Sequence, residues 1–561
     1  MAKYLITSAL PYANGPIHFG HIAGAYLPAD IFNRFLHQKG EEVIYICGTD
    51  EYGVAITINA EKAGVGYKEY VDRNHNLIKA FFDKLNIRFD HFSRTTIPEH
   101  AVLAQEFFLE LHKKGHIKPA VEAQFYCATC NRFLADRYVS GTCPKCGADN
   151  VRGDECTKCG EWLDPSKIVK PACKVCGKTP EIRQTTQYFL DLKAFAPRLK
   201  EWLETKKDWK PNVKNKALSL IEEGLVERAI TRDISWGVPV PLDEAKGKVL
   251  YVWFDAPIGY ISATMEWARL AGKPEAWKDW WLNKETKLVH FIGKDNIIFH
   301  TIVWPAMLLG QDKPYIIPDN VPGNEFYNLE GKQFSKSDGW YIDTEDFFSK
   351  YGVDALRYAI ASNGPETSDS QFTWEDFQGR NNELADTLGN LVNRCFSFMK
   401  KNFDGKIPAA GELQPEDKAL LDSFGPVFDE VGKDYYSYKV RQALTQTMAL
   451  AIAANKYVND TAPWKLRKTD LARCGTVLNV ASRAIINVAI LLYPVIPDTA
   501  LKILAKAGLD HGGKAPEFKP YAGSLDNRAL GADDTLLFAK ILDEQIKLEV
   551  EKLKASANPP A

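Results

Sequence analysis

The first fifty residues alternate between short apolar runs and one longer segment with helical spacing. Tyr4 to Leu10 and Val43 to Cys47 are apolar runs of strand length, and the segment from about His18 to Gln38 between them has the pattern of a helix. A strand, a helix and a second strand in this order form a βαβ unit, whose strands lie parallel in one sheet. The pattern therefore predicts an α/β fold at the N-terminus.

This alternation stops near Lys118 and returns much later in the chain. Strand patterns reappear at Val249 to Phe254 and at Leu288 to Gly293, and a helical segment through Leu309 follows the second of them. The intervening segment is dense in Gly, Pro, Lys and Cys. We therefore predict one α/β domain split by an insertion, with its first half at residues 1–115, the insertion at 116–230 and the second half at 231–325.

Beyond the α/β part, the chain changes to a loop and then to long amphipathic helices. A loop from Gly331 to Gly339 precedes a predicted helix from about Thr344 to Ser362, within a linking region of residues 326–375. From residue 376 to 561, apolar residues recur at the three- and four-residue spacing of helices that bury one face. This part of the chain is predicted to be a helical bundle.

The overall composition is that of a soluble globular protein. Of the 561 residues 45% are hydrophobic and 25% are charged, which fits about three or four domains. The most apolar late stretch, Val480 to Pro497, is interrupted by Arg483 and Asn487, so we expect a buried bundle helix and no membrane partner. Because the formal net charge is only −2, contact with a nucleic acid requires local basic or aromatic patches.

Eight of the eleven cysteines form four CxxC pairs in the insertion. Met1 to Gly15 lacks the pattern of a secretory signal, so we expect a cytoplasmic protein whose cysteine pairs bind metal and form no disulfides. Four pairs supply ligands for two structural Cys₄ zinc sites, and one or two Zn²⁺ ions per chain are expected. Sequential and nested pairing are both possible, and we favour nested pairing because the middle unit is a compact knuckle. The pairs are Cys127/Cys130, Cys143/Cys146, Cys156/Cys159 and Cys173/Cys176.

Two histidines flank a glycine at the start of the first predicted helix, in the segment Pro11 to His21, PYANGPIHFGH. The free N–H groups and partial positive charge of a helix N-terminus attract anions. Gly20 lets an adenine or a phosphate approach the backbone closely, and His18 and His21 lie beside that path as donors. The alternative is that two polar residues only decorate a helix start, and the residues alone leave both interpretations open.

A second candidate is Lys336, in the segment Gln333 to Ser337, QFSKS. A lysine on a mobile loop can close over phosphates and neutralise the charge of a leaving pyrophosphate. Taken alone, such a loop is usually just solvated. The combination with the HxGH segment, on opposite halves of a split domain, is far more specific.

Together the two motifs resemble the HIGH and KMSKS signatures of class I aminoacyl-tRNA synthetases. The segments ICGTDEYG, ITRDISWGVPVP, YVWFDAPIGY and FIGKDNIIFHTIVWPAML resemble the methionyl-tRNA synthetase family, over about Tyr4 to Trp464. The resemblance implies a Rossmann-like catalytic domain split by the zinc insertion and followed by a helical anticodon-binding domain. It also implies a ligase that activates L-methionine with ATP and Mg²⁺ and transfers it to the 3′ end of methionine tRNA.

The resemblance also implies residue roles in ATP binding. His18, Gly20 and His21 are expected to bind ATP, with both histidines stabilising the phosphates during attack, and Lys336 is expected to act on the pyrophosphate side. One position departs from the family pattern. Gln333 stands where the loop signature has its first lysine, with Lys332 beside it, which puts in doubt an ATP contact at that position.

An amino-acid pocket with one anionic anchor is implied as well. Asp50, in the turn after the second strand, matches the carboxylate that holds the α-ammonium group, although such a residue can also bond its own turn. An apolar slot with aromatic walls suits a thioether side chain, and His300 is either a polar contact in that slot or a satisfied core histidine. The expected pocket residues are Ala9, Leu10, Tyr12, Asp50, Trp253, Ala256, Pro257, Tyr260, Phe299 and His300.

For the helical domain the resemblance implies that Asn390, Arg394 and Trp464 read the anticodon. The first two lie four residues apart on one helix face and offer an amide and a guanidinium to base edges. Trp464 follows Pro463 after a helix, where its ring can stack on a base. The alternative is a tryptophan that caps the bundle core beside a solvated polar pair.

Three other functions explain fewer features. The YVWFDAPIGY segment and the lack of a large editing insertion disfavour a cysteinyl or leucyl enzyme of the same class. A small-molecule nucleotidyltransferase also uses HxGH but needs neither zinc knuckles nor a long helical domain. A zinc-ribbon RNA-binding protein with an inactive catalytic domain conflicts with intact His18, His21 and Lys336. Because the chain ends in a charged helix, Asp543 to Ala555, and a short tail, we expect a monomer.

Overall fold

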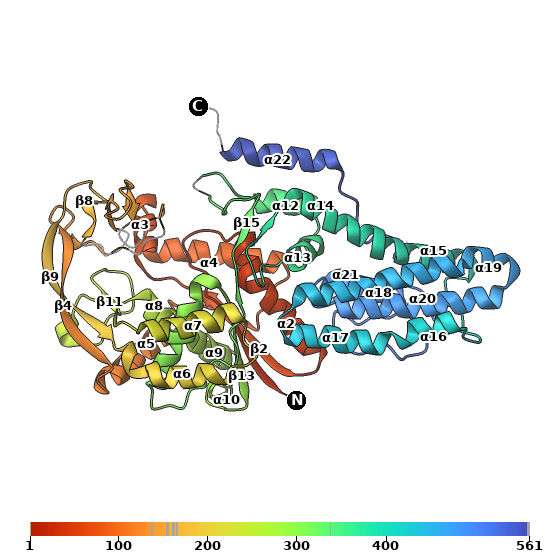
Figure 1. Cartoon of the computed structure of the whole chain (residues 1–561), viewed down its shortest axis with the longest axis horizontal. Helices are drawn as coiled ribbons and strands as arrows, with labels where there is room; N and C mark the ends of the chain where they lie inside the picture. The colour runs from red at the N-terminus through yellow and green to blue at the C-terminus, as the bar shows by residue number, and fades with distance from the viewer. Residues whose placement is uncertain are drawn as a thin grey trace.

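The central sheet of the N-terminal half has five strands, all paired in parallel (Figure 1). They are β1 (Lys3–Ser8), β2 (Glu42–Thr49), β3 (His91–Arg94), β13 (Thr286–Gly293) and β14 (Gly323–Asn324), in the order β14-β13-β1-β2-β3. The computed structural model describes residues 2–135, 138–152, 156, 158–159, 163, 167–336 and 338–557. Because β13 follows the cysteine-rich segment and still pairs with β1, the parallel sheet and its split by an insertion are confirmed.

Helices with an apolar stripe pack against this sheet. The predicted helix after β1 is confirmed as a continuous run of α1 (Phe19–His21), a π-helical segment (Ile22–Tyr26) and α2 (Leu27–Gln38). Helices α2 and α9 (Gly259–Leu270) both contact β2. The other helices of this half are α3 (Val54–Ala63), α4 (Tyr67–Lys84), α5 (Pro98–Lys113), α10 (Trp277–Trp281) and α11 (Trp304–Leu309).

Two predicted elements differ in the structure. The strand predicted at Val249 to Phe254 is only β12 (Val249–Leu250), paired with β11 (Thr231–Arg232), and it is followed by α8 (Val252–Asp255). Val252 and Phe254 are buried in this helical turn, so tertiary packing outweighs their strand propensity. The predicted helix from Thr344 to Ser362 is two helices, α12 (Thr344–Lys350) and α13 (Val353–Ser362), because Gly352 between them is extended.

The insertion is built on a long antiparallel ribbon, which forms the left edge of the molecule in Figure 1. Its strands β4 (Ile117–Cys127) and β9 (Glu181–Leu190) pair without a register shift from Ile117↔Leu190 to Tyr126↔Glu181. Short strands β5 (Arg132–Phe133), β6 (Val139–Thr142), β7 (Val151–Arg152) and β8 (Val169–Cys173) lie at its far end, where the cysteines gather. Helices α6 (Ala196–Thr205) and α7 (Pro211–Glu223) lead back to the sheet.

The C-terminal half is a helical bundle centred on α20 (Leu471–Leu492). This helix is long and apolar enough to cross a membrane by composition, yet 94% of its most apolar window is buried. The predicted buried helix is thus confirmed, although it starts at Leu471, before Val480, and Pro497 already belongs to the next helix. The other helices here are α14 (Trp374–Glu383), α15 (Asn390–Asn402), α16 (Pro415–Asp422), α17 (Phe424–Tyr436), α18 (Val440–Thr461), α19 (Pro463–Thr469), α21 (Pro497–Lys506) and α22 (Asp543–Ala557).

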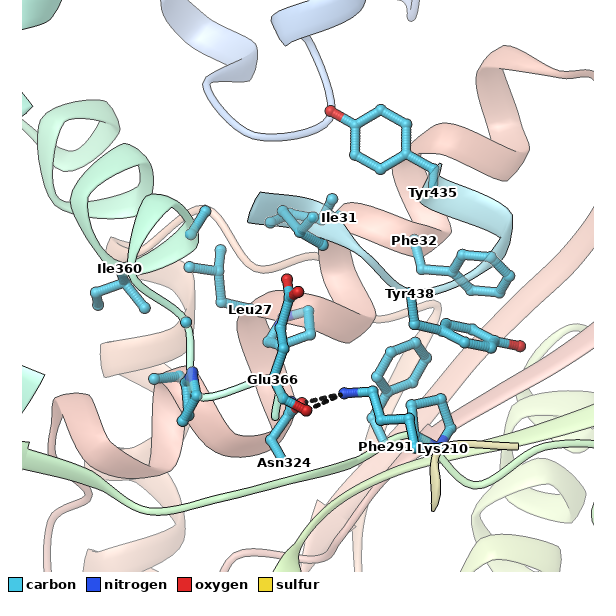
Figure 2. A pocket seen from close by; sticks show the side chains of 17 residues that line it. Leu27, Ile31, Phe32, Lys210, Phe291, Asn324, Ile360, Glu366, Tyr435 and Tyr438 are labelled. Atoms are coloured by element: carbon cyan, nitrogen blue, oxygen red, sulfur yellow. Dashed lines mark hydrogen bonds between the residues drawn. The ribbon is translucent and has the colours of Figure 1, made fainter. Parts of the chain in front are cut away.

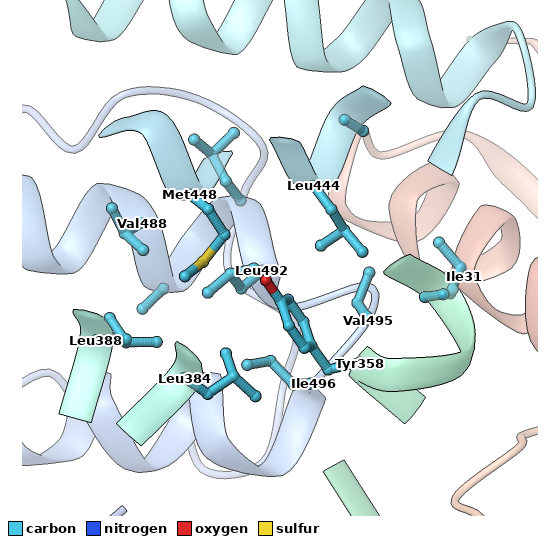
Figure 3. Packing of buried hydrophobic residues seen from close by; sticks show 14 of the residues in the cluster. Ile31, Tyr358, Leu384, Leu388, Leu444, Met448, Val488, Leu492, Val495 and Ile496 are labelled. Carbon is cyan, nitrogen blue, oxygen red and sulfur yellow. The ribbon is translucent and has the colours of Figure 1, made fainter. Parts of the chain in front are cut away.

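The core of the bundle continues into the α/β half through α13. Figure 3 shows Tyr358 of α13 among Met448 of α18 and Leu492 of α20, with Ile31 of α2 at the edge of the same cluster. All these side chains are buried. The two halves therefore share one hydrophobic core and pack as a single unit.

A fully buried ion-pair cluster reinforces this contact. Arg357 of α13 and Arg34 of α2 both donate to Asp30 Oδ2, at 2.6 and 2.8 Å. Arg357 also donates to carbonyl oxygens of Leu85, Asn86, Pro494 and Val495, so one guanidinium joins the α/β half to the bundle. The two arginine charges lower the pKa of Asp30 against the opposing effect of burial, which is the larger single influence.

A cavity at the same junction is lined by residues of α2, of the helical bundle and of the segment just before α7 (Figure 2). Lys210, just before α7, donates to the Asn324 side chain and to the Glu366 carbonyl at 2.7 and 3.1 Å. Burial lowers the pKa of Lys210 to about 8. Apolar walls from Phe291, Tyr435 and other residues surround this amine, and no predicted site residue lines the cavity. The hydrogen bonds of Lys210 thus connect the segment that leads from the insertion back to the sheet with the junction between the two halves.

Replacing Asp30 with Asn is expected to destabilise the whole chain. The change leaves the buried guanidinium groups of Arg34 and Arg357 without their shared carboxylate, and breaking a buried ion pair costs about 3–5 kcal/mol. Urea unfolding measures this loss. The control Asp460→Asn breaks an exposed pair with Lys456, in which the Asp460 side chain is 61% exposed, and should leave the free energy of unfolding almost unchanged. Equal effects of the two substitutions would contradict a structural role of the cluster.

Candidate active site

The predicted site residues come together because the carboxyl ends of parallel strands share one edge of the sheet. The chain leaves β1 through Ala9 to Ala13 and leaves β2 at Asp50. Backbone hydrogen bonds join these two exits, from Asp50 N to the Pro11 carbonyl at 2.9 Å and from Ala13 N to the Asp50 carbonyl at 2.8 Å. The HxGH segment and Asp50 are therefore held side by side.

His18 and His21 pack against each other at the start of α1. Their ring centroids are 3.9 Å apart, and His21 Nδ1 accepts the backbone N–H of His18 at 3.2 Å. Burial is the main reason that the pKa of His18 falls to about 2, whereas His21 is exposed. Both rings are neutral at neutral pH, and since Nδ1 of His21 is an acceptor, its proton lies on Nε2.

The Lys336 loop lies against this pair of histidines. Phe334 stacks on His18 at 4.5 Å between centroids, and the backbones of Ser335 and Trp340 pair to close the loop into a hairpin. The ammonium of Lys336 is near enough to contribute to the low pKa of His18, after burial and His21. The two motifs, more than 300 residues apart in the sequence, are brought together here; Ser337 lies outside the described residues.

Gly20 stands where no larger residue fits. A Cβ at this position would lie 2.9 Å from the carbonyl oxygen of Tyr327 and 3.0 Å from the His18 ring. Tyr327 belongs to β15 (Tyr327–Leu329), just ahead of the Lys336 loop. A side chain at position 20 would therefore push the loop away from the histidines, and glycine is required for the close approach.

The aromatic residues predicted for the amino-acid pocket come from α8, α9 and the segment before α11. Trp253 and Phe299 are in T-shaped contact at 4.4 Å, and Tyr260 Oη lies 2.8 Å from His300 Nε2. His300 Nδ1 contacts the carbonyl oxygen of Asn296 at 3.0 Å, so Nδ1 carries the proton and Nε2 accepts from the tyrosine. Both ring nitrogens of His300 thus have partners, and burial lowers its pKa to about 4.

The remaining predicted pocket residues flank these aromatics. Ala9 is fixed by its N–H to the Phe291 carbonyl and by the Tyr26 hydroxyl on its own carbonyl. Leu10 Cδ1 would lie only 2.8 Å from a Cβ at Gly259, at the start of α9, and the Tyr12 hydroxyl would lie 2.8 Å from a Cβ at Gly53. Ala256 and Pro257 form the 3₁₀ turn that joins Trp253 to Tyr260 along the chain.

Asp50 is the carboxyl group predicted to anchor the amino acid. Its side chain is buried, and Oδ1 has no hydrogen-bond partner among the described residues. Burial, and then the neighbouring Asp255, raises the pKa of Asp50 well above its ordinary value. An orphaned carboxylate oxygen in a buried position is costly, and a cationic partner would offset that cost.

Three buried polar residues near the site were missed in the sequence. Asp255 and His100 contact each other at 3.2 Å, and His290 of β13 bonds Thr7 and accepts from Trp304 Nε1 at 3.2 Å beneath Tyr260. Their partners are distant in the sequence, so no local pattern identifies them. The one indication in the sequence concerns Asp255 alone, which lies in YVWFDAPIGY, a segment that resembles the methionyl-tRNA synthetase family.

The eight cysteines form two separate clusters, which confirms the nested pairing. Within each cluster the four sulfur atoms lie within 4.8 Å of one another. Measured sulfur separations of 3.4 to 4.0 Å match the edge of about 3.8 Å in a tetrahedron with Zn–S bonds of about 2.3 Å. Both donor sets therefore fit a metal ion such as Zn²⁺. The outer cluster is Cys127, Cys130, Cys173 and Cys176; the inner cluster is Cys143, Cys146, Cys156 and Cys159.

In the bundle, two of the three predicted anticodon residues touch. The Arg394 guanidinium lies 5.0 Å from the centroid of the Trp464 ring and donates to Asn459 Oδ1 at 3.0 Å. Trp464 is 39% exposed, so its ring is not enclosed in the bundle core. Asn390 is exposed one helical turn before Arg394. Arg394 of α15 and Trp464 of α19 therefore lie together on the outside of the bundle.

Comparison with known proteins gives consistent matches over the whole chain. A family model described as tRNA synthetases class I (M) matches residues 4–396, and one described as the anticodon binding domain of methionyl tRNA ligase matches residues 407–557. The methionine–tRNA ligase of Protochlamydia amoebophila is 48% identical over 558 residues, covering 98% of this chain and 79% of the relative. That of Pyrococcus abyssi is 46% identical over 572 residues, covering 100% and 78%.

Solved structures agree with these matches. Mycobacterium tuberculosis methionyl-tRNA synthetase in complex with methionyl-adenylate superposes with a TM-score of 0.79 at 27% identity, covering 96% of this chain and all of that chain. The apo form of the same enzyme gives a TM-score of 0.74 at 25% identity. Because the sequence matches span both halves at far more than 30% identity, the chain belongs to the methionyl-tRNA synthetase family of class I aminoacyl-tRNA synthetases.

Proposed function

We propose how individual residues carry out the reaction of this methionine–tRNA ligase. Its family catalyses ATP-dependent activation of methionine to methionyl-adenylate, followed by transfer to the 3′ end of methionine tRNA. The observation that carries the residue assignment is the contact between the HxGH histidines and the Lys336 loop at the strand ends, beside the buried Asp50. A strand-edge site with donors on one side and an anionic anchor on the other suits an anionic nucleotide and a zwitterionic amino acid.

In the first step, a carboxylate oxygen of methionine forms a bond to the α-phosphorus of ATP, and the bond from that phosphorus to the β-bridging oxygen breaks. Charge grows on the phosphate oxygens and on the leaving pyrophosphate. Neutral His18 and His21 donate N–H groups to the phosphate oxygens, His21 from Nε2. Lys336 neutralises the charge on the leaving pyrophosphate. Gly20 is proposed to contact ATP through its backbone, and its lack of a side chain lets the strand ahead of the Lys336 loop approach the histidines. Mg²⁺ bound to ATP supplies further charge neutralisation.

Methionine is held at both ends in this proposal. Asp50 accepts the α-ammonium group, which is supported by its orphaned buried oxygen. The thioether lies among Trp253, Tyr260 and Phe299, with Ala9, Leu10, Tyr12, Ala256, Pro257 and His300 completing the slot. Because Tyr260 already donates to His300, the slot has few unsatisfied polar groups and favours an apolar chain. Such a slot discriminates by about 1–3 kcal/mol per methylene.

The two cysteine clusters are proposed to hold one structural Zn²⁺ each. Support comes from four thiols per cluster with sulfur spacing suited to a tetrahedral ion. With four cysteines on each ion, no coordination position is left for a substrate, so the role is to stiffen the tip of the β4–β9 ribbon. This tip is proposed to hold the acceptor end of the tRNA during transfer.

The helical half is proposed to read the anticodon through Asn390, Arg394 and Trp464. A half-exposed ring beside a guanidinium is a platform on which an unstacked base can lie. We also propose that the protein acts as a monomer in the cytoplasm, because one chain contains the parts needed for both activation and tRNA recognition. The proposed domain limits are residues 1–115 and 231–325 for the catalytic domain, 116–230 for the insertion, 326–375 for the linker and 376–561 for the helical domain.

Lys336→Ala should lower the rate of methionine-dependent pyrophosphate exchange by about 10²–10³. This is the scale for losing one preorganised donor to developing charge. Methionine binding without ATP, measured by calorimetry, should barely change. The parallel variant Lys332→Ala tests whether the neighbour of Gln333 shares the role and is expected to have the smaller effect. Near-normal exchange in Lys336→Ala would mean that the loop lysine is only solvated.

The purified protein should contain two zinc ions per chain by elemental analysis. Cys143→Ser should remove the inner ion and Cys127→Ser the outer one, because each breaks a different tetrahedron. Cys143→Ser should impair tRNA charging more than pyrophosphate exchange, since the tip is proposed to hold the acceptor end of the tRNA and not the ATP. Loss of both ions from the Cys143→Ser variant would speak against independent sites.

Trp464→Ala should reduce tRNA charging at least about tenfold, since base–aromatic stacking is worth about 1–3 kcal/mol. Methionine-dependent pyrophosphate exchange should stay near wild type because the catalytic domain is distant in the fold. Trp464→Phe keeps a ring and should recover part of the charging activity. Parallel loss of both activities with a lowered melting temperature would mean that Trp464 supports the fold and does not read the anticodon.

A further inference from the structure

Asp255 is a buried carboxyl group that the proposed mechanism leaves without a role. It is the last residue of α8, two positions after Trp253 and directly before Ala256, and its side chain is fully buried. Oδ2 lies 3.2 Å from Nε2 of His100, on α5. Oδ1 is buried with no hydrogen-bond partner among the described residues. An unpaired carboxylate oxygen next to the amino-acid pocket requires an explanation.

The hydrogen bonds of His100 show that one proton lies between His100 and Asp255. Ser262 Oγ is 3.3 Å from the carbonyl oxygen of Gly259, one turn earlier on α9, and we assign the serine proton to this bond. The Ser262 oxygen, 3.0 Å from His100 Nδ1, then accepts the Nδ1–H bond of the ring. A neutral ring with its hydrogen on Nδ1 has a bare Nε2, so the contact with Asp255 needs a proton. The pair is either neutral or an imidazolium with a carboxylate.

Burial favours the neutral pair. Neither side chain has exposed surface. Burial lowers the pKa of His100 to about 3 and raises the pKa of Asp255 well above its ordinary value. Separated charges in a dry site cost more than a neutral hydrogen bond, so the proton belongs on the Asp255 carboxyl.

No other charged group in the described surroundings compensates an ionised Asp255. In the turn after β2, Glu51 is bonded by Arg94 at 2.8 Å and by Thr49 at 2.7 Å, so Arg94 is already engaged. The Tyr52 phenol, whose pKa burial and Asp255 raise, stays neutral. Asp50 is the remaining group, and burial and Asp255 raise its pKa as well, so the two carboxyl groups are not both ionised. A negative Asp255 would repel the negative Asp50.

We infer that Asp255 is a positioning residue that stays a neutral acid and donates its proton to a hydrogen bond with His100, so that Asp50 alone presents negative charge to the α-ammonium group of methionine. This inference rests on the proposed role of Asp50. A single anion matches the single positive charge of the substrate backbone. Two ionised carboxylates would leave one buried charge unpaired after binding.

The isosteric variant Asp255→Asn tests the charge state. Its amide can donate to His100 Nε2 as the protonated acid does, so the KM for methionine in pyrophosphate exchange should stay within about threefold of wild type. Asp50→Asn should raise the same KM at least about tenfold, because it removes the ion-pair partner of the ammonium. If Asp255→Asn raises KM as much as Asp50→Asn does, Asp255 is an anion and the inference fails.

Infrared spectroscopy reads the proton directly and does not depend on substrate. Wild-type protein labelled with ¹³C-aspartate should show the C=O stretching band of a protonated carboxyl at neutral pH, and Asp255→Asn should lose it. In His100→Gln the acceptor becomes an amide oxygen, so the band should shift in frequency and persist. A missing wild-type band, or one that His100→Gln leaves unmoved, overturns the assignment even where Asp255→Asn does not fold.

A matched control separates this site from other buried acids. Asp354 of α13 is also buried with a raised pKa, but it accepts from the backbone N–H of Thr499 at the contact with the bundle. Asp354→Asn should leave the Asp255 band in place. An unchanged KM for methionine in Asp50→Asn would refute the proposed anchor and with it the Asp255 inference. A raised KM in Asp50→Asn, together with no protonated Asp255 band in the wild type, would refute the Asp255 inference alone.

Discussion

The pairing of β1 with β13 is the contact on which the active site depends. β1 lies between β2, from the first half of the catalytic domain, and β13, which follows the insertion, and its six residues from Lys3 to Ser8 pair with Thr286 to Phe291. This pairing fixes where the chain leaves the sheet at Ala9 and thus where the HxGH segment begins. The Lys336 loop can reach His18 only because β13, from the second half of the catalytic domain, pairs with β1 in this register. Both halves of the catalytic chemistry are therefore positioned by backbone hydrogen bonds in one buried strand.

Much of the site could be predicted because its signals are local. The glycine between His18 and His21, the serine-flanked Lys336 and the CxxC spacings are each visible within a few residues, and their order along the chain made them specific. Nested cysteine pairing was favoured over sequential pairing because the middle unit is a compact knuckle. The predicted strands at the start of the chain were right because continuous apolar runs of that length are typical of buried parallel strands.

Other features could not be predicted because they depend on contacts between distant residues. Asp30 and Arg357 are 327 positions apart, and Asp255 and His100 are 155 apart. Each pair consists of ordinary charged residues whose burial only the folded chain reveals. The strand prediction for Val249 to Phe254 was wrong for a related reason. Its β-favouring residues form α8, which buries Phe254 and Asp255 beside α5. Local propensity is a weak guide where packing decides.

The unbroken register of the β4–β9 ribbon has a consequence for reach. Eleven residues of β4 at about 3.3 Å each carry Cys127, a ligand of the outer metal cluster, about 35 Å from the start of the strand at Ile117. The far end of this ribbon rests on α3 of the catalytic domain, where Arg132 donates to Glu61 and Tyr138 donates to Thr57, so the length of the ribbon must match the position of α3. Shortening each strand by two residues would draw the tip in by about 7 Å with its faces unchanged. Shortening each by one would turn the tip over, so the ribbon length can vary only in steps of two.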